Sequence, residues 1–396
     1  MGDEILRAEL PTFIVTADHD TSMTEYDTIV VGVGGMGSAT AAHLAKRGEN
    51  VLGLERYDIP HSMGSSHGVT RIIRKAYYEH PDYVPLLERA YELWDELDAT
   101  HPTELLHTTG CIVAGPDGSE KVAGARESCE THGLAYERLS AEEVGERYPG
   151  YDLPEDFVAI FEPDGGFLHV EQCVVAHVNE AHRHGADIRA REGVLDWEPT
   201  ADGGVRVETR EGSYTADTMV VTAGAWAANL LPMLRVEARP ERQVLGWFHP
   251  DDSEAFQPDS FPVFTMGCEE GYFYGFPEYG VPGYKVGKYN HFHENVSPDD
   301  VADPTPADER VLRDFTERYF PEAAGPTMRL ETCLFTNSPD EHFIIDTLPD
   351  HPQVVVGAGF SGHGFKLSSV VGEILADLAI DGESRHDIEL FSLDRF

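Results

Sequence analysis

The sequence predicts an α/β fold in which a Rossmann-type domain is interleaved with an α+β domain built on a mainly antiparallel sheet. Three observations support this prediction. Glycine-rich segments lie near both ends of the chain, at 32–37 and 357–364. Apolar residues at helical spacing follow the first segment, and short strand-like runs fill 242–287. We therefore expect the two ends of the chain to meet in one domain.

The first glycine-rich segment completes a strand–helix–strand unit. It follows the apolar run 28–31, opens a helix-like stretch at 36–47 and is followed by a second strand at 50–54. In this pattern the glycines permit a tight turn, let backbone N–H groups approach a pyrophosphate and allow the helix to pack on the strand. The helix dipole favours phosphates there. The predicted cradle consists of Gly32, Gly34, Gly35, Met36 and Gly37.

Glu55 closes the second strand, with Arg56 directly after it. A carboxylate at this offset, about 20 residues from the first glycine, accepts the ribose hydroxyls of a dinucleotide. It argues against a 2′-phosphorylated cofactor, because two anions would meet. The strand, the helix, the second strand and the acid agree, so we predict nucleotide binding in preference to an unliganded glycine-rich turn.

Further helices are predicted at 83–98, 140–147, 170–184 and 367–378. The first has Leu86, Leu93 and Trp94 at helical spacing, and the second begins with Ser140 as N-cap and Glu143 at the third position after it. The predicted strands are 111–114, 204–209, 213–216, 218–221, 242–248, 272–276, 284–287 and 354–356. The turn 222–226 follows one of these strands and opens a second strand–turn–helix unit.

These elements suggest a division into domains. We assign 26–105, 160–238 and 341–396 to the nucleotide-binding domain, and 106–159 and 239–340 to a substrate domain. We expect 1–25 to form an N-terminal extension before the first strand. A chain of 396 residues with 41% hydrophobic content can bury a core for both domains.

Charge is the most unusual property of the composition. The chain has 71 acidic and 29 basic residues, a formal net charge of -42. Such a charge repels nucleic acid and anionic membranes, so we expect neither as a partner. Dense surface acid with few lysines is typical of proteins that stay dissolved in concentrated salt, and we predict a halophilic source.

Cysteine usage and hydropathy indicate the compartment. The 5 cysteines show no paired spacing, so they predict neither a metal site nor a disulfide framework. No apolar stretch is long enough to span a bilayer, and the N-terminus has acids in place of a basic signal region. We predict a cytoplasmic protein without a metal.

Two segments of the chain lack acids yet are polar and basic. The segment 59–78 contains His67, Arg71 and Arg74, and 279–293 contains Lys285. Such cationic islands in a negative protein suit an anionic cofactor or a substrate carboxylate. An intramolecular salt-bridge surface is the alternative.

Motifs spread over the chain resemble those of the monomeric sarcosine oxidase family of FAD-dependent amine oxidases, which includes N-methyltryptophan oxidase. The similarity extends from about Tyr26 to the C-terminus. The motifs are GVTRIIR at 68–74, FEP at 161–163, RQV at 242–244, YGFP at 274–277, DEHFIID at 340–346 and GFSGHGFK at 359–366. Together they are far more specific than the glycine fingerprint alone.

The resemblance implies an FAD attached through a cysteine thioether, and Cys333 falls at the attachment position. A small core residue is the alternative interpretation of Cys333. The resemblance also implies further contacts with the cofactor. These residues are Ser65, His67, Thr70, Arg71, Gly359, Gly362, His363, Gly364 and Lys366.

The same resemblance implies a substrate site. Arg74 and Lys366 fall where the family binds the amino-acid carboxylate, and Lys285 matches the lysine near flavin N5 that promotes reaction with oxygen. Arg71 matches a residue over the flavin ring. Two positions depart from the family: Tyr289 stands where histidine is common, with His291 close behind it, and Phe335 stands where tyrosine is common. We predict Tyr274, Tyr289 and His291 as further catalytic residues and Phe335 as a substrate contact.

The predicted reaction is oxidation of the secondary amine of an N-methyl amino acid such as sarcosine. Hydride-equivalent transfer to FAD would give an imine that water hydrolyses, and oxygen would be reduced to hydrogen peroxide. N-methyltryptophan, a cyclic imino acid and a glycated amino acid are the alternative substrates. We expect a monomer that has the amino acid and oxygen as its partners.

Three other classes of protein were considered. An NAD-linked dehydrogenase explains the first glycine segment but neither Cys333 nor the second segment. The run 64–68 matches the G-x-S-x-G elbow of serine hydrolases, but no hydrophobic strand precedes it, so we interpret the match as accidental. A non-catalytic flavoprotein would not need the set Arg71, Arg74, Lys285 and Lys366.

Overall fold

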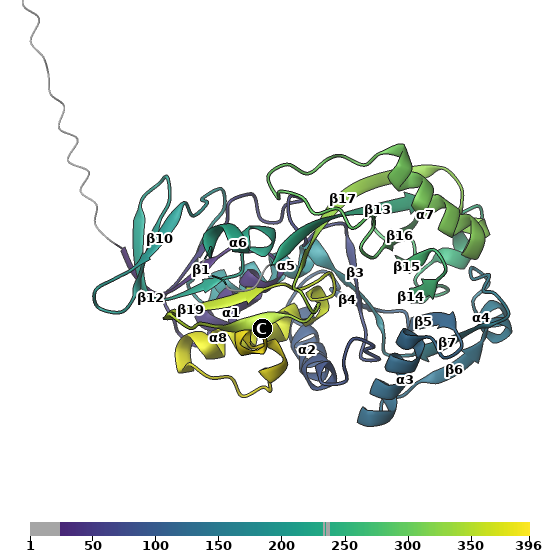
Figure 1. Cartoon of the computed structure of the whole chain (residues 1–396), viewed down its shortest axis with the longest axis horizontal. Coiled ribbons are helices and arrows are strands. Elements are labelled where there is room, and N and C mark those ends of the chain that lie inside the picture. The colour runs from purple at the N-terminus through teal and green to yellow at the C-terminus, as the bar shows by residue number, and fades with distance from the viewer. Residues whose placement is uncertain (1–23, 233, 235–237) are drawn as a thin grey trace, which may run out of the picture.

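The structure, a computed structural model, describes residues 24–232, 234 and 238–396 (Figure 1). These residues form two eight-stranded sheets joined by a three-stranded sheet. The first eight-stranded sheet is mainly parallel at its centre and the second is mainly antiparallel, so the predicted fold class is confirmed. The division of the chain at the predicted domain boundaries stays a prediction.

The first sheet has the strand order β10-β11-β12-β1-β2-β9. Strand β19 also pairs with β12, and β18 pairs with β19. Its strands are β1 Thr24–Val31, β2 Val51–Leu54, β9 Asp187–Arg189, β10 Asp196–Pro199, β11 Val205–Glu208, β12 Ser213–Val221, β18 Ile344–Leu348 and β19 His351–Ala358. Strand β2 and the second halves of β1, β12 and β19 are buried and mostly apolar, as expected for parallel strands covered on both faces. Strands β1 and β19, from the first and last parts of the described chain, therefore lie in one sheet on either side of β12 (Figure 1).

Helices cover this sheet. Helix α1 (Gly35–Lys46) contacts both α5 (Val170–Arg183) and α8 (Ser368–Asp381), and α2 (Tyr83–Asp98) packs on α8. The close approach of α1 and α8 depends on small residues: a Cβ atom on Gly372 would lie 2.5 Å from Cβ of Ala39. The short α6 (Ala227–Leu230) follows the turn after β12.

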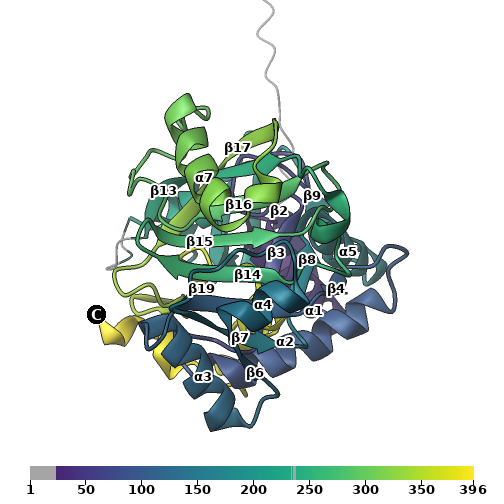
Figure 2. The ribbon, with the colours of Figure 1, turned by 90° about the vertical axis from the view of Figure 1, so that its right-hand side faces the viewer.

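The second sheet has the order β17-β13-β16-β15-β14-β5-β7-β6. Its strands are β5 Cys111–Pro116, β6 Glu137–Ser140, β7 Phe157–Glu162, β13 Arg239–Phe248, β14 Val263–Cys268, β15 Gly271–Phe276, β16 Tyr284–Lys288 and β17 Thr327–Asn337. Helix α7 (Pro306–Tyr319) packs against β13 and β16, and α3 (Glu120–His132) packs against β5 and β7 (Figure 2). An aromatic core that includes Phe264, Phe273 and Phe315 fills the space beneath α7.

The three-stranded sheet consists of β3 (Thr70–Ile73), β8 (Gly166–His169) and β4 (Leu106–Thr108), in the order β3-β8-β4. Strand β8 leads directly into α5, so the ladder between β3 and β8 fixes the start of α5 beside the loop that precedes β3. This loop between β2 and β3 contains many of the predicted site residues.

Several predicted elements are confirmed, and some differ. Helix α4 (Ala141–Arg147) has the complete capping box of Ser140 and Glu143. The predicted strands 213–216 and 218–221 are one strand, β12, because the ladder continues through the exposed Asp217. The predicted extension 1–25 is too long by two residues, since β1 begins at Thr24 and pairs with Tyr214 and its neighbours; 1–23 lie outside the described residues.

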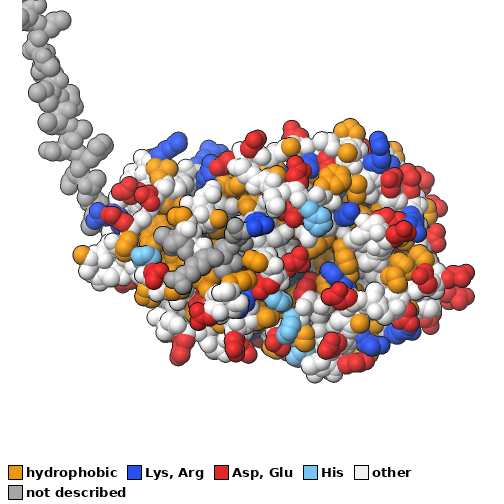
Figure 3. All heavy atoms as spheres, in the orientation of Figure 1, with side chains coloured by type: hydrophobic (Ala, Val, Ile, Leu, Met, Phe, Trp, Pro, Cys, Tyr) orange, Lys and Arg blue, Asp and Glu red, His pale blue; other side chains and the backbone are white. Residues whose placement is uncertain are grey.

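Acidic side chains are spread over the face drawn in Figure 3 and gather at the end where α4 and α7 lie. Among the described residues, no helix combines the length and the apolar character that crossing a bilayer needs. Within the same ranges, no group of histidine, cysteine and acidic residues is placed to hold a metal ion.

The substitution Gly372→Ala tests the close contact of α1 and α8. The added methyl group would lie 2.6 Å from the backbone carbonyl carbon of Ala39, so we expect the free energy of unfolding to fall by about 1–3 kcal/mol. Gly145→Ala in α4 is the matched control, because the nearest atom to its new methyl group is 3.7 Å away and alanine favours helices by about 0.5–1 kcal/mol. Chemical denaturation measures both, and a neutral Gly372→Ala would contradict the packing.

Candidate active site

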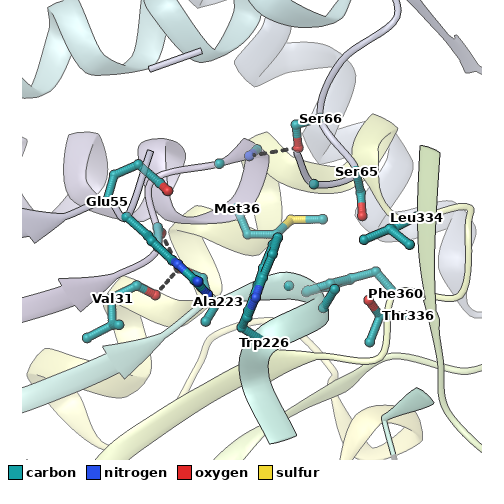
Figure 4. A pocket seen from close by; sticks show the side chains of 18 of the residues that line it. Val31, Met36, Glu55, Ser65, Ser66, Ala223, Trp226, Leu334, Thr336 and Phe360 are labelled. Carbon is teal, nitrogen blue, oxygen red and sulfur yellow. Dashed lines mark hydrogen bonds between the residues drawn. The ribbon is translucent and has the colours of Figure 1, made fainter. Parts of the chain in front are cut away.

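A cavity of about 310 Å³ lies at the carboxyl ends of β1, β12 and β19 (Figure 4). The predicted cofactor residues that line it are Gly32, Gly34, Gly35, Met36, Glu55, Arg56, Ser65, Arg71, Gly359, Gly362 and Gly364. Figure 4 shows Met36, Trp226 and Phe360 around the same space. The two glycine-rich segments thus meet at one cavity, which we call the cofactor cavity.

The glycines of the first segment permit close approaches that a side chain would block. Gly32 has φ +90°, and a Cβ atom there would lie 2.8 Å from the carbonyl oxygen of Thr222. At Gly37 it would lie 1.8 Å from the carbonyl oxygen of Gly32, so this glycine brings α1 onto the strand without lining the cavity itself. The N–H of Gly35 donates to the hydroxyl of Ser66 over 3.1 Å (Figure 4). The cradle fits a phosphate-containing dinucleotide at the start of a helix.

Glu55 sits at the end of β2 and is 5% exposed. Its Oε2 accepts the N–H of Val33 over 2.9 Å, and its Oε1 accepts the N–H of Tyr57 over 3.0 Å. The carboxylate therefore braces the glycine turn and lines the cavity at the same time. Arg56 forms an exposed ion pair with Asp299 over 2.8 Å at the rim.

Ser66 of the G-x-S-x-G match is part of this cradle. No strand precedes it, because the chain between β2 and β3 runs as a loop. Its hydroxyl accepts the Gly35 N–H, which is a structural role in the cavity wall. This geometry agrees with the interpretation of the match as accidental.

Lys285 of β16 is 2% exposed and faces the loop before β3. Its Nζ donates to the carbonyl oxygens of Gly68 (2.7 Å) and Thr70 (2.8 Å) and to the Thr70 hydroxyl (3.0 Å). Burial and the adjacent Arg71 hold the pKa of Lys285 well below its ordinary value. Thr70, a predicted cofactor contact, does not line the cofactor cavity. Its carbonyl oxygen and hydroxyl bond Lys285 instead.

Cys333 lies on β17 beside the same loop and is 3% exposed. Nη2 of Arg71 lies 3.5 Å from its sulfur, and His67 forms an ion pair with Glu331 over 3.1 Å. Burial alone would raise the pKa of the Cys333 thiol, but the positive charges of His67 and Arg71 lower it to about 7. The thiol is therefore close to its reactive form at neutral pH.

A second, smaller cavity of about 70 Å³ adjoins the first, since Arg71, Phe335, Gly362 and Phe365 line both. We call it the substrate cavity. Its further predicted site residues are Arg74, Tyr274, Tyr289, His363 and Lys366. The structure thus brings the carboxylate-binding candidates together beside the cofactor cavity.

Arg74 is 2% exposed at the end of β3. Its Nη2 donates to both oxygens of Glu79, over 2.9 and 2.8 Å, and its guanidinium lies 4.0 Å from the ring centre of Tyr78. Burial would raise the pKa of the Glu79 carboxyl, but Arg74 lowers it to about 2. Nothing in the sequence distinguishes Glu79, because one more acid in so acidic a chain gives no signal.

Lys366 follows the second glycine segment and is 6% exposed. Its Nζ donates to the carbonyl oxygen of His363 over 2.7 Å. Burial, and next Arg74, lower the pKa of Lys366 to about 7. The His363 ring in turn bonds the hydroxyl of Tyr77 over 2.5 Å, so a buried chain of contacts fixes the lysine.

The two departures from the family lie together in the substrate cavity. The rings of Tyr289 and Phe335 are 5.2 Å apart, and the Tyr289 hydroxyl donates to the carbonyl oxygen of Ser361. Gly362 makes room for Phe335, since a Cβ atom there would lie 2.4 Å from the ring. Tyr274 fills the adjacent wall against Gly287.

His291 does not line either cavity, so its catalytic role stays a prediction that the position of its side chain does not support. Its ring bonds Asp308 over 2.9 Å, and its backbone N–H donates to Gln243 over 3.0 Å. Asn290, with φ +51°, turns the chain directly after Tyr289 and sends His291 towards α7. The side chain belongs to a buried network with Arg242, which also bonds Asp308.

Comparisons with known proteins agree with this geometry. The model of the family "FAD dependent oxidoreductase" matches residues 27–378. The chain is 43% identical over 378 residues to monomeric sarcosine oxidase of Bacillus sp. (strain B-0618), covering 94% of this chain and 96% of the relative. It is 38% identical over 378 residues to N-methyl-L-tryptophan oxidase of Yersinia pestis (strain Pestoides F), covering 94% and 100%.

Solved structures share the fold. NikD, an amino acid oxidase of nikkomycin biosynthesis, matches with a TM-score of 0.81 and 26% identity, covering 93% of this chain and 98% of NikD. L-proline dehydrogenase from P. horikoshii matches with a TM-score of 0.81 and 22% identity, covering 94% and 98%, and shows the fold alone. The chain belongs to the family of FAD-dependent oxidoreductases that includes monomeric sarcosine oxidase and N-methyl-L-tryptophan oxidase.

The substitution Glu79→Gln tests the buried ion pair of Arg74. Removing one partner leaves a buried charge without compensation, so we expect the free energy of unfolding to fall by about 3–5 kcal/mol at neutral pH. The native pKa of about 2 lies below the ordinary value of 4.5, so the advantage of the wild type is complete above pH 4.5 and shrinks as the pH falls towards 2. Denaturation at several pH values measures this difference.

Glu92→Gln is the control for this experiment. Its side chain is 65% exposed and pairs with Arg89 at the surface, so we expect a change within about 0.5 kcal/mol. An equal effect of the two substitutions, or an effect of Glu79→Gln that stays constant down to low pH, would contradict the assignment.

Proposed function

We propose that the protein oxidises the secondary amine of an N-methyl amino acid such as sarcosine. The observation that carries the proposal is the position of Arg74 and Lys366: both are buried cations in a small cavity that shares a wall with the cofactor cavity. A planar guanidinium and an ammonium together suit a carboxylate. The amine of the same small molecule would then lie beside the shared wall.

The cofactor of the family is FAD, and the cofactor cavity fits it. The glycine cradle and Glu55 would hold the pyrophosphate and ribose of the dinucleotide, and Ser65 and Arg71 also line the cavity. Bound FAD supplies the acceptor for the hydride equivalent and passes both electrons to oxygen, which yields hydrogen peroxide, while water hydrolyses the imine to a primary amine and an aldehyde. Accepting a hydride equivalent and then passing both electrons to oxygen are the roles of a flavin and not of NAD.

The residues of the chain supply binding, orientation and electrostatics. Arg74 and Lys366 would anchor the carboxylate, while Phe335, Tyr289 and Tyr274 exclude water from the amine. Lys285 would promote the reaction with oxygen, because a buried cation stabilises negative charge that develops on oxygen. Its three N–H groups already bond the loop before β3, so it acts through its charge.

The size of the substrate cavity favours a small amino acid. Its volume is about 70 Å³, and Phe335 and Tyr289 close one side of it. Sarcosine suits this space better than N-methyltryptophan, a cyclic imino acid or a glycated amino acid. The relatives are named for sarcosine and for N-methyl-L-tryptophan, so both fall within the same reaction class.

Further properties follow from charge and from the relatives. A formal net charge of -42 supports a protein that binds neither nucleic acid nor anionic membranes and that works in concentrated salt. The name of the sarcosine oxidase relatives supports a monomer. We keep the cytoplasm as the proposed location, on the grounds of cysteine usage.

We also propose that FAD is covalently attached through Cys333. A thiol with its pKa near 7, beside His67 and next in sequence to Leu334, which lines the cofactor cavity as Arg71 does, is suited to nucleophilic attachment. The structural alternative, a small core residue, does not explain why a buried histidine and a half-buried arginine lie beside the sulfur.

The substitution Lys366→Met tests the carboxylate anchor. We expect KM for sarcosine to rise about ten- to a hundredfold, since a charge-assisted hydrogen bond contributes about 1.5–3 kcal/mol, while flavin stays bound. In the wild type, a bound carboxylate favours the protonated lysine, so affinity for small carboxylates falls as the pH rises above about 7. Steady-state kinetics and titration of the flavin spectrum measure both effects.

Lys46→Met is the matched control, because this lysine is 41% exposed on α1 and pairs with Glu180 far from the cavities. Unchanged KM in Lys366→Met, or the same pH dependence of binding in that variant as in the wild type, would refute the role of Lys366.

The substitution Cys333→Ala tests covalent attachment. Wild-type protein precipitated with acid should retain yellow flavin in the pellet, and Cys333→Ala should release it. His67→Asn should slow attachment, because the thiol loses the charge that lowers its pKa. Cys129→Ala, at a buried cysteine of α3, should behave as the wild type. Release of flavin from wild-type protein would exclude the thioether.

A further inference from the structure

The loop before β3 contains a strained turn. Gly68 has φ +86° and Val69 has φ +71°. A positive φ is costly for a β-branched residue, so Val69 keeps this conformation only because its surroundings enforce it. Such strain calls for a partner that holds the turn.

Glu171, in the first turn of α5, is that partner. Its Oε1 accepts the N–H of Gly68 over 2.8 Å and the N–H of Val69 over 3.2 Å. The N–H of Val170 donates to the carbonyl oxygen of Val69 over 2.9 Å, so the start of α5 contacts the turn on both sides. The ladder between β3 and β8 fixes this start in place.

The peptide group between Gly68 and Val69 connects Glu171 with Lys285. Its N–H donates to the Glu171 carboxylate, and its carbonyl oxygen accepts from the Lys285 Nζ over 2.7 Å. A peptide polarised from both ends, by an anion on its N–H and a cation on its carbonyl, strengthens both hydrogen bonds. The carboxylate and the ammonium thus interact through one peptide group in a dry interior.

The remaining surroundings of Lys285 show why such a partner matters. Arg71 of β3 faces the lysine with the same charge, while Cys333 and Glu331 of β17 and the rings of Trp247 and Phe276 complete its surroundings. Glu331 is already paired with His67 and Arg329. Among these groups, Glu171 opposes the loss of the proton from Lys285 most strongly.

The second carboxylate oxygen of Glu171 indicates that the negative charge of this side chain matters, and not only its hydrogen bonds. Its Oε2 is buried and has no hydrogen-bond partner among the described residues. The titratable groups that face Glu171, besides Lys285, are His169 and Cys173. A neutral side chain with one oxygen could accept both N–H groups of the turn equally well. Anchoring the backbone therefore does not explain why the side chain carries a second, unbonded carboxylate oxygen.

We propose that Glu171 is a positioning residue for Lys285: its carboxylate holds the Gly68–Val69 turn and, through the peptide group between these residues, keeps the buried ammonium charged. This inference rests on the proposed role of Lys285 in the reaction with oxygen. Glu171, on helix α5, would set the pH range in which Lys285 of strand β16 carries its charge.

Glu171→Gln separates charge from geometry, because the amide oxygen can still accept both N–H groups. We expect the titration of Lys285 in the holoenzyme to move to lower pH by about one unit or more. NMR of protein with carbon-13-labelled lysine measures this titration, and Lys285→Arg assigns the signal. Glu180→Gln is the control: Glu180 is a buried carboxylate on the same helix, but it pairs with Lys46 and Arg183.

The reaction with oxygen supplies a second readout. Holoenzyme reduced with dithionite is mixed with oxygenated buffer, so no amine substrate enters the measurement. We expect the pH at which reoxidation slows to be lower in Glu171→Gln than in the wild type and in Glu180→Gln, with unchanged reduction by sarcosine. If the substrate assignment is wrong, this comparison still holds.

Equal Lys285 titrations in the wild type and in Glu171→Gln would overturn the inference. Equal reoxidation rates in Lys285→Met and the wild type would instead refute the role of Lys285 within the proposed function. The effect of Glu171 on the Lys285 titration would then be decided by the NMR measurement alone. If Glu171→Gln does not fold, Glu171→Asp replaces it. Aspartate keeps the charge at a greater distance, so the titration should shift in the same direction by a smaller amount, and an unshifted titration would overturn the inference.

Discussion

The clustering of four cations beside the two cavities is the constraint on which the rest of the site depends. Arg74, Lys285 and Lys366 are buried and the half-buried Arg71 lines both cavities, in a chain whose net charge is strongly negative. A buried charge is costly unless it is paired and hydrogen-bonded. The structure meets this requirement with backbone carbonyl oxygens and with the carboxylates of Glu79 and Glu171, of which Glu171 also holds the Gly68–Val69 turn.

The positive charges of the site are only partly compensated by carboxylates and carbonyl oxygens. The remaining positive charge is what suits the site to bind a carboxylate and to stabilise a thiolate. Lys366 has only the carbonyl oxygen of His363 as a hydrogen-bond acceptor among the described residues, so a substrate carboxylate supplies charge that the protein does not. Around Cys333 the balance favours the cations, which stabilises a thiolate. At Lys285 all three donors of the ammonium are used by Gly68 and Thr70, while burial lowers the pKa of this lysine.

The sequence alone predicted those parts of the fold and site that depend on local patterns. The cradle and Glu55 follow a spacing fixed by one strand–helix–strand unit, and the capping box of α4 is a four-residue signal. Arg74 and Lys285 stood out in acid-free basic segments, but their roles and that of Lys366 were reached through a family resemblance, because their convergence depends on three different sheets and segments. Glu79 and Glu171 were missed, since acids are too frequent here to stand out. Strand β17 was missed because its first half is polar and partly exposed, and the side chain of His291 lies outside both cavities because a single positive φ at Asn290 reverses its direction.

The most direct test of the account is the visible spectrum of the holoenzyme mixed with sarcosine in the absence of oxygen. Flavin absorbance should bleach as the amine is oxidised, and admission of air should restore it with formation of hydrogen peroxide. A yellow protein whose spectrum stays unchanged at saturating sarcosine would contradict the claim that the two cavities together oxidise a small N-methyl amino acid.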